Sequence, residues 1–119
     1  MYSTEGRYHM KISKELAKGT TAMLVLSVLS EREMYGYEIT GVISGRSEGV
    51  FEMKEGTLYP ILHSLEKEGM LTSYRAESAQ GRERRYYKIT PTGLMHLKLK
   101  RSEWSTYSEA VERVMEEAT

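Results

Sequence analysis

The sequence predicts a mainly α-helical fold of the α+β class, and three observations predict it. Several segments in the first half carry apolar residues at helical spacing. A stretch of alternating polarity with a Gln-Gly turn signal follows them, as in a β-hairpin. A long amphipathic segment then closes the chain. Because 119 residues suffice for one domain with an appended helix, we expect a domain at residues 1–90 and a helix at residues 91–119.

The composition excludes several classes of protein. Because the chain contains no cysteine, it has neither disulfides nor cysteine-ligated metal sites, and a cytoplasmic location is expected. No apolar run approaches the ~20 residues of a membrane-spanning helix. The N-terminus also lacks the hydrophobic core of a signal peptide, so no membrane partner is expected. The formal net charge is zero, so the local distribution of charge must decide whether nucleic acid is a partner.

Catalysis is not expected. The histidines His9, His63 and His96 fall on separate segments, without cysteine or carboxylate neighbours at metal-ligand spacing on a shared face. The sequence also has no glycine-rich phosphate-binding motif. We therefore expect no enzyme activity, no catalytic residue, no metal site and no cofactor.

The first half of the chain contains the elements of a helical core. A short helix is expected over Ser13–Lys18 and a longer one over Thr20–Glu31, each with a hydroxyl residue able to cap its start. The longer helix is apolar on most sides and should lie centrally in the core. A polar connector, Glu31–Tyr35, leads to a further helix over Gly36–Gly49.

The segment Glu55–Leu71 predicts a helix with two different faces. Its apolar residues lie at i, i+3, i+4 and i+7, and they are Leu58, Ile61, Leu62 and Leu65. The opposite face carries Pro60, His63, Ser64 and Lys67, with Thr57 and Tyr59 on its flanks. A DNA recognition helix needs an apolar anchor and an outer face with hydrogen-bonding groups. An ordinary amphipathic surface helix gives the same pattern, so this segment alone leaves both interpretations open.

Pro60 affects where this helix should begin. A proline at the end of the first turn removes few backbone hydrogen bonds, whereas one further inside costs ~3 kcal/mol or more. We therefore expect a late helix start, near Gly56–Thr57.

The stretch Thr72–Thr90 predicts a two-stranded hairpin that turns at Gln80-Gly81. Tyr87 and Ile89 should point inward, and Tyr86 and Lys88 outward. Five basic residues against two acidic ones give the hairpin a charge of +3, whereas the segment Thr20–Met53 carries −3. The neutral total therefore conceals a basic hairpin. Its cations either meet DNA phosphates or keep an exposed β-edge from aggregating.

The segment Pro91–Thr119 predicts one long helix, with a start marked by Thr90-Pro91. Alternating spacings of three and four give a coiled-coil-like seam, interrupted by two polar positions. The seam consists of Leu94, Leu97, Arg101, Trp104, Ser108, Val111, Met115 and Ala118, widened by Tyr107 and Val114. We expect the early part to pack on its own domain and the later part on a second copy. The alternative is a helix folded wholly onto its own domain.

This order of elements is that of a winged helix-turn-helix with a long C-terminal dimerisation helix. Several sequence motifs accompany these elements, and they are Glu15-Leu16-Ala17-Lys18-Gly19-Thr20, Tyr35-Gly36-Tyr37-Glu38-Ile39, Gly56-Thr57-Leu58-Tyr59-Pro60-Ile61-Leu62, Leu65-Glu66-Lys67-Glu68-Gly69-Met70-Leu71 and Arg85-Tyr86-Tyr87-Lys88-Ile89-Thr90 with Gly93. Together they resemble the PadR family of bacterial transcriptional regulators, in the branch with a single C-terminal helix. The chain departs from the family in having Lys54-Glu55 where a small capping residue is common.

The resemblance implies a homodimeric repressor of a pseudo-palindromic operator. The implied DNA-binding residues are Thr57, Tyr59, His63, Ser64 and Lys67 on the recognition helix, Arg82, Arg84 and Arg85 in the wing, and Tyr37 at the start of the preceding helix. The implied partners are double-stranded DNA and a second copy of the chain. The alternative is a winged-helix module that contacts proteins and does not bind DNA specifically.

Trp104 is the one tryptophan of the sequence and falls on the expected seam. The resemblance implies that a tryptophan here stacks flat aromatic effectors between subunits, and paired indoles do give an apolar slot for planar ligands. The residues expected at such a dimer and effector site are Trp104, Leu97, Tyr107, Val111 and Met115. The alternative is that Trp104 only anchors the dimer interface by packing.

Overall fold

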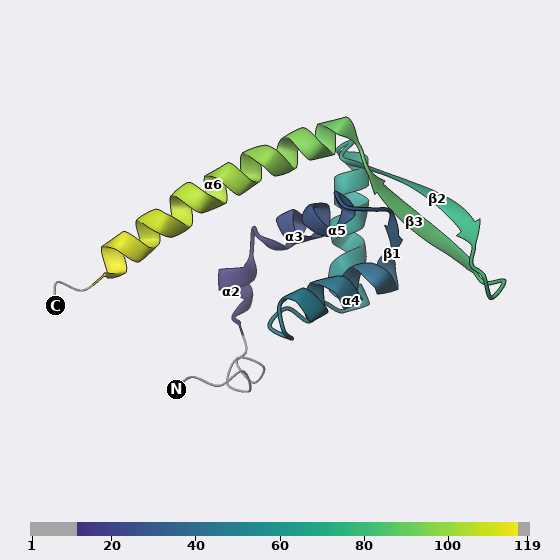
Figure 1. Cartoon of the computed structure of the whole chain (residues 1–119), viewed down its shortest axis with the longest axis horizontal. Coiled ribbons are helices and arrows are strands. Elements are labelled where there is room, and N and C mark those ends of the chain that lie inside the picture. The colour runs from purple at the N-terminus through teal and green to yellow at the C-terminus, as the bar shows by residue number, and fades with distance from the viewer. Residues whose placement is uncertain (1–11, 117–119) are drawn as a thin grey trace.

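The computed structural model describes residues 12–116, so His9 and Ala118 lie outside the described part of the chain. Five helices and three strands form in this range. Their order is α2 (Lys14–Ala17), α3 (Thr21–Leu29), β1 (Met34–Tyr35), α4 (Gly36–Arg46), α5 (Glu55–Lys67), β2 (Leu71–Glu77), β3 (Glu83–Ile89) and α6 (Pro91–Met115). Figure 1 shows β2 and β3 projecting from one end of a helical body, while α6 extends as a rod away from it. The winged-helix fold predicted from the sequence is confirmed.

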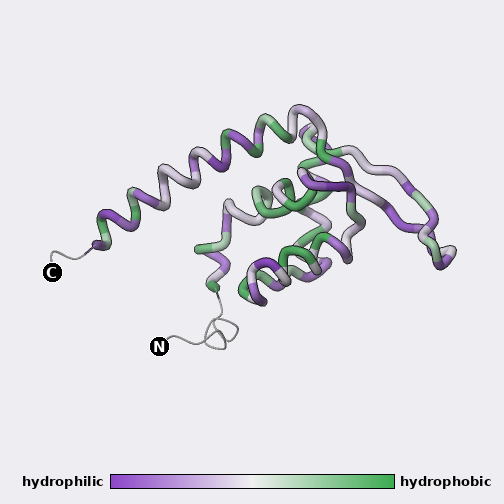
Figure 2. The backbone as a smooth tube through the Cα atoms, in the orientation of Figure 1, coloured by the Kyte–Doolittle hydropathy of each residue, from purple (hydrophilic) through white to green (hydrophobic). Residues whose placement is uncertain are grey.

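Helix α3 lies at the centre of the core, as its apolar composition predicts. Val25, Leu26, Val28 and Leu29 are all buried, and Figure 2 shows this helix as the most continuous hydrophobic segment of the body. Every other main element contributes to the same core, which also contains Met34, Ile39, Ile43, Leu58, Leu62, Leu65, Leu71, Tyr87 and Leu97. One contiguous core therefore fixes α5 and the strands relative to each other.

The helix boundaries differ slightly from the expected ones. The Ser13 hydroxyl accepts a hydrogen bond from the Leu16 amide at 3.2 Å, which confirms its capping role in α2. The Thr20 hydroxyl does not cap α3, because it donates to the Ala17 carbonyl at 2.9 Å. Helix α4 ends at Arg46 instead of Gly49.

The hairpin predicted over residues 72–90 is confirmed as β2 and β3, and the short strand β1 joins it to make a three-stranded sheet. The strand order is β1-β3-β2, all antiparallel. The short strand β1 lies in the segment that was expected to be only a polar connector. Tyr86 stands opposite both Tyr35 and Tyr74, with ring centroids 5.6 and 5.7 Å away. Tyr86 is therefore half-buried in a tyrosine cluster and not simply exposed.

Helix α5 begins at Glu55, one residue before the expected start. Pro60 consequently lies inside the helix. Its missing N–H removes the bond that a residue there would make to the Gly56 carbonyl, a loss of one backbone hydrogen bond. The Leu58, Leu62 and Leu65 side chains, all buried, hold α5 against the core at this small cost.

Helix α6 leaves the body soon after it begins. Only Gly93 and Leu97 are buried among its residues. Arg101 donates to the Ser27 hydroxyl of α3 at 3.1 Å, and beyond this contact most of the helix is exposed. The radius of gyration, 16.4 Å, accordingly exceeds the roughly 13.5 Å of a compact chain of this length. Among residues 12–116, no helix is both long and apolar enough to cross a bilayer.

Candidate nucleic-acid interface

Helix α5 presents the polar face that its sequence predicts. Thr57, Tyr59, His63, Ser64 and Lys67 are all exposed, on the side opposite the buried leucines. This arrangement supplies hydroxyl, imidazole and ammonium groups along one edge of a helix that the core holds firmly. Such a helix can lie in the major groove of DNA with its side chains against base edges.

Tyr59 also contacts the start of the preceding helix. Its phenol packs over Gly36, at the first residue of α4. The Glu38 carboxylate accepts a hydrogen bond from the Tyr35 amide at 3.2 Å, which satisfies a backbone donor at this helix start. Tyr37 projects from the same turn and is 78% exposed, so it is accessible to a partner.

The three wing arginines do not form one cluster. Successive side chains of a strand point to opposite faces of the sheet. Arg84 lies over the Tyr35 ring, with its guanidinium carbon 4.2 Å from the ring centroid. Arg85 points to the other face, where it donates to the Ser73 hydroxyl at 2.8 Å. Arg82 sits before β3 in the turn and is exposed.

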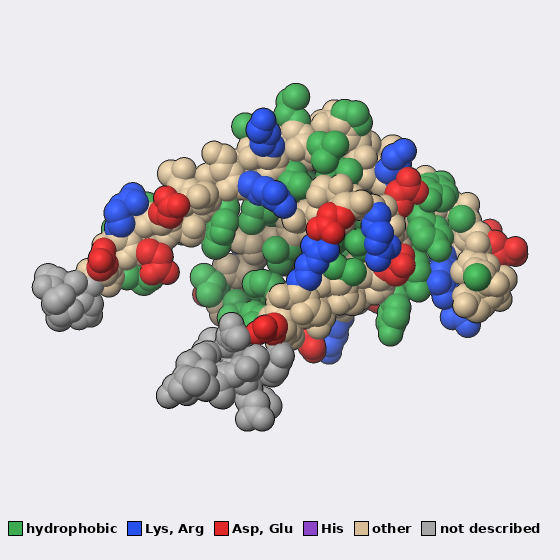
Figure 3. Space-filling model, in the orientation of Figure 1, with side chains coloured by type: hydrophobic (Ala, Val, Ile, Leu, Met, Phe, Trp, Pro, Cys, Tyr) green, Lys and Arg blue, Asp and Glu red, His purple; other side chains and the backbone are tan. Residues whose placement is uncertain are grey.

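Acidic side chains compensate part of the wing charge. Arg75 pairs with Glu83 at 3.0 Å, and Lys88 lies 3.9 Å from Glu33. Figure 3 shows red and blue side chains interspersed over the wing on the face in view. The Arg75–Glu83 pair is already included in the hairpin's charge of +3, whereas Glu33 lies outside the hairpin and offsets part of that charge.

A chain of hydrogen bonds, here called the polar relay, joins the wing to α5. The Arg85 guanidinium donates to the Ser73 hydroxyl, and this hydroxyl donates to the Glu66 carboxylate of α5 at 2.7 Å. Beside the relay lies an open hollow of about 410 Å³, lined by Tyr59, His63, Glu66, Arg85 and Tyr87. Burial raises the pKa of the Tyr87 phenol, with the Arg85 charge opposing the shift. The phenol is thus protonated at neutral pH and can donate a hydrogen bond.

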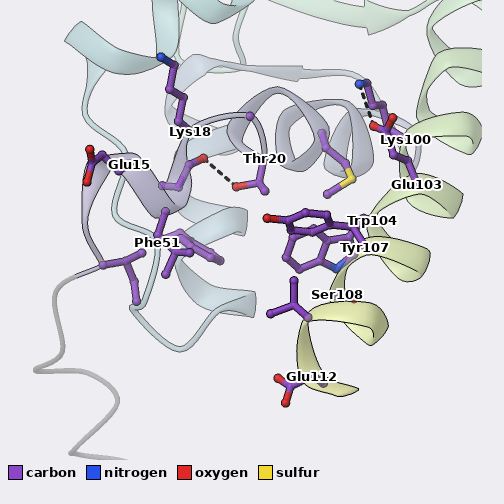
Figure 4. Close-up of a pocket in the computed structure, with 16 residues that line it drawn as sticks. Glu15, Lys18, Thr20, Phe51, Lys100, Glu103, Trp104, Tyr107, Ser108 and Glu112 are labelled. Atoms are coloured by element: carbon purple, nitrogen blue, oxygen red, sulfur yellow. Dashed lines mark hydrogen bonds and ion pairs between the residues drawn. The ribbon is translucent and has the colours of Figure 1, made fainter. Parts of the chain in front are cut away.

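A second cavity separates α6 from the N-terminal helices. This cleft, of about 710 Å³, lies between α2 and α3 on one side and the second half of α6 on the other. Figure 4 shows Trp104 and Tyr107 projecting into it from α6 toward Phe51 and Thr20. The two aromatic rings are tilted, with centroids 6.4 Å apart.

The residues expected at a dimer and effector site are divided by the structure. Trp104, Tyr107 and Val111 line the cleft together. Leu97 does not belong with them, because it is buried in the core of its own chain. Met115 lies near the end of α6, outside the cleft, and is 61% exposed.

Sequence reasoning missed several residues of these sites. Glu66 and Tyr87 line the hollow, Ser73 is hydrogen-bonded to Glu66 beside it, and Leu16 and Phe51 line the cleft. The strand alternation of Ser73 and Tyr87 was a usable signal, because both lie on the same face as Arg85. No group of three His, Cys, Asp or Glu residues suited to a metal ion occurs within the described range.

Comparison with known proteins gives consistent matches. The model of the "Transcriptional regulator PadR-like family" matches residues 25–99. A transcriptional regulator of Mycobacterium tuberculosis is 32% identical over 80 residues, which are 67% of this chain and 71% of that protein. The structure of a transcriptional regulator from Clostridium thermocellum is similar with a TM-score of 0.80 and 33% identity, covering 87% of this chain and all of that one.

A second solved structure agrees. A PadR-like transcriptional regulator from Bacillus cereus gives a TM-score of 0.76 at 28% identity, and the match covers 87% of this chain and 99% of that chain. The matched residues 25–99 contain α5 and both strands of the wing, together with the part of α6 that packs on the body.

Proposed function

Because the chain belongs to the PadR-like family of transcriptional regulators, we propose that it is a homodimeric repressor that binds a pseudo-palindromic operator through α5 and the wing. The observation that carries this proposal is the division of α5 into a buried leucine stripe and an exposed polar face. Thr57, His63, Ser64 and Lys67 then approach base edges and flanking phosphates, with Tyr37 and Tyr59 beside them. Arg82, Arg84 and Arg85 contact the DNA backbone from the wing.

The exposed surface of α6 supports a dimer. Trp104, Tyr107, Val114 and Met115 are 46%, 64%, 85% and 61% exposed, so much of their apolar surface is left uncovered by the described part of the chain. Contiguous apolar surface of this kind marks an interaction site. The same helix of a second copy carries the complementary surface, and two-fold symmetry would place two recognition helices on successive turns of DNA.

The cleft beside α6 supports control by a small molecule. Its volume suits a drug-sized ligand, and Trp104 and Tyr107 offer flat faces for stacking. Three carboxylates line this cleft, Glu15, Glu103 and Glu112, against two lysines, Lys18 and Lys100, so an aromatic or cationic compound suits it. Binding would displace α6 relative to α2 and change the spacing of the two recognition helices, which lowers operator affinity. The alternative is that Trp104 only packs the dimer interface.

Selection of duplexes from a random pool tests the proposed function. We expect enrichment of an inverted repeat with half-sites about one helical turn apart. Replacing Arg82, Arg84 and Arg85 together by alanine should weaken binding and flatten the salt dependence by roughly 0.9 for each phosphate that is no longer neutralised. A protein that stays monomeric in sedimentation and enriches no sequence would favour the alternative, a winged helix used only for protein contacts.

Tryptophan fluorescence tests the effector. Planar cations should quench Trp104, which is the chain's single tryptophan, and should release the selected duplex in the same concentration range. Quenching without release would assign the cleft a binding role but no regulatory one.

A further inference from the structure

The hollow between α5 and β3 gathers hydrogen-bond donors from two elements. Tyr59 and His63 come from α5, and Arg85 and Tyr87 come from β3. The phenols of Tyr59 and Tyr87 have no hydrogen-bond partner in the part of the chain that the structure describes, and neither does the His63 ring. Arg85 has a single one, the Ser73 hydroxyl at 2.8 Å. A guanidinium has five N–H donors in a planar fork, so most of them remain available for a ligand.

These donors suit one tetrahedral anion. Arginine binds phosphate oxygens in a bidentate manner, and phenol or imidazole N–H and O–H groups add directional bonds. The hollow opens beside the exposed face of α5, where His63 is directed outward. A DNA strand that borders the major groove occupied by α5 would carry its phosphates past this opening.

Glu66 gives the hollow a second property. Its carboxylate accepts the Ser73 hydroxyl at 2.7 Å and so stands in the same relay as Arg85. The carboxylate offsets the charge of Arg85, and the hollow is close to neutral before an anion enters. Its attraction for phosphate is therefore weakened, while Ser73 holds the guanidinium in one orientation.

We propose that this hollow binds a single DNA phosphate and that Arg85 contacts this phosphate directly. Glu66 lowers the net charge of the hollow, and Ser73 holds Arg85 in position. This inference rests on the proposed DNA-binding function and extends it to residues with opposite effects. Arg85 strengthens binding to DNA of any sequence, Glu66 weakens it, and Ser73 acts only through Arg85.

Fluorescence anisotropy with a labelled random-sequence duplex, measured over a series of salt concentrations, tests the proposal. Arg85→Ala should bind roughly tenfold more weakly, and its salt slope should be lower by roughly 0.9. Glu66→Gln keeps an acceptor for Ser73 but removes the charge, so it should bind roughly two- to fivefold more tightly. Lys98→Ala removes an exposed charge from α6, away from the hollow, and serves as the control with an unchanged slope.

Ser73 requires a double-mutant cycle. Ser73→Ala should weaken binding of the wild-type protein but have no effect in the Arg85→Ala background, because a positioning residue has nothing to position there. A purely structural role would weaken both. Thermal unfolding of each variant checks the fold, and Arg85→Gln replaces Arg85→Ala if the latter lowers the melting temperature.

The outcomes separate this inference from the proposed function. If the wild-type protein binds DNA with a steep salt slope and Arg85→Ala keeps that slope, the hollow does not bind a phosphate. The proposed DNA-binding function is then still supported. Tighter binding is the sign expected for Glu66→Gln, so weaker binding would also overturn the assignment. If the wild-type protein binds no duplex at low salt, the proposed function itself fails.

Discussion

The phenolic oxygen of Tyr59 lies 2.6 Å from the position that a Cβ atom would take on Gly36. A side chain fits at this position only if Tyr59 moves aside, so the first residue of α4 and the Tyr59 ring of α5 are in direct contact. The contact fixes the direction in which Tyr59 leaves α5. The position of a proposed DNA-binding side chain thus depends on the absence of a side chain at the start of α4.

Gly36→Ala should impair DNA binding more than it impairs stability. The atom in the way is the end of a side chain that is 42% exposed, so Tyr59 can move aside without disrupting the core. We expect the free energy of unfolding to fall by about 1 kcal/mol at most, while affinity for the selected operator decreases several-fold. Denaturant unfolding and anisotropy measure the two quantities.

The double variant Gly36→Ala, Tyr59→Phe provides the control for this contact. Removal of the hydroxyl leaves the Tyr59 ring carbon at 3.1 Å as the nearest neighbour, a distance that small shifts accommodate. The double variant should recover the ring position but lack the hydroxyl. If Gly36→Ala binds the operator as well as the wild type, the contact does not position Tyr59.

Gly93→Ala should destabilise the fold strongly. A Cβ there would lie 2.3 Å from the Met70 carbonyl oxygen, which is backbone and cannot rotate away. We expect the free energy of unfolding to fall by about 1–3 kcal/mol or more. The reason is that α6 must move away from Met70, which lies in the short connection between α5 and β2. Gly41→Ala is the matched control, because Gly41 is an exposed residue of α4 and nothing lies within 4 Å of its Cβ position. This variant should raise the free energy of unfolding by up to ~1 kcal/mol.

Much of the fold could be predicted because its signals are local. The leucine stripe of α5 and the apolar composition of α3 determine which faces are buried before any tertiary contact forms. Strand β1 was missed because two residues have no period, and the strand exists only through pairing with Tyr86 and Tyr87. Leu97 matched a seam by spacing, yet the chain's own core covers it.

The candidate site was predictable only in part for the same reason. Helical spacing alone places His63, Ser64 and Lys67 on one face of α5. By contrast, the separation of Arg84 from Arg85 follows from strand alternation, and the relay from Arg85 to Glu66 joins residues from different elements. Such contacts depend on the angle between the wing and α5, which no local pattern encodes.

Leu97→Ala and Trp104→Ala should affect different equilibria. Leu97 is 5% exposed in the core, so truncating it should lower the free energy of unfolding by about 2–5 kcal/mol. Trp104 is 46% exposed, and its truncation should leave the fold of one chain intact while it weakens association of two copies. Sedimentation over a concentration series and thermal unfolding measure the two effects. A Trp104→Ala protein that is as dimeric as the wild type would remove Trp104 from the proposed interface.

Tyr74 should make the fold sensitive to high pH. Its hydroxyl donates to the Glu33 carboxylate, and this hydrogen bond raises the pKa of Tyr74, with desolvation and the Glu33 charge acting in the same direction. A pKa that is higher in the folded state means that the stabilisation is complete below the unfolded value of about 10. It is lost as the pH rises through the folded pKa, because the phenolate can no longer donate and is repelled by Glu33.

Tyr74→Phe should therefore flatten the alkaline part of the stability profile. Thermal unfolding of this variant and of the wild type, measured from neutral pH to above about pH 10, should converge at the alkaline end. Tyr37→Phe removes a hydroxyl that is 78% exposed, and it should follow the wild-type profile throughout. Because Glu33 also lies 3.9 Å from Lys88, Lys88→Gln should increase the repulsion between Glu33 and a Tyr74 phenolate. The folded pKa of Tyr74 would then rise further, and the loss of stability in the Tyr74-containing protein would extend to higher pH. Parallel profiles for wild type and Tyr74→Phe would show that the hydrogen bond from Tyr74 of β2 to Glu33, the residue before β1, contributes nothing to the alkaline transition.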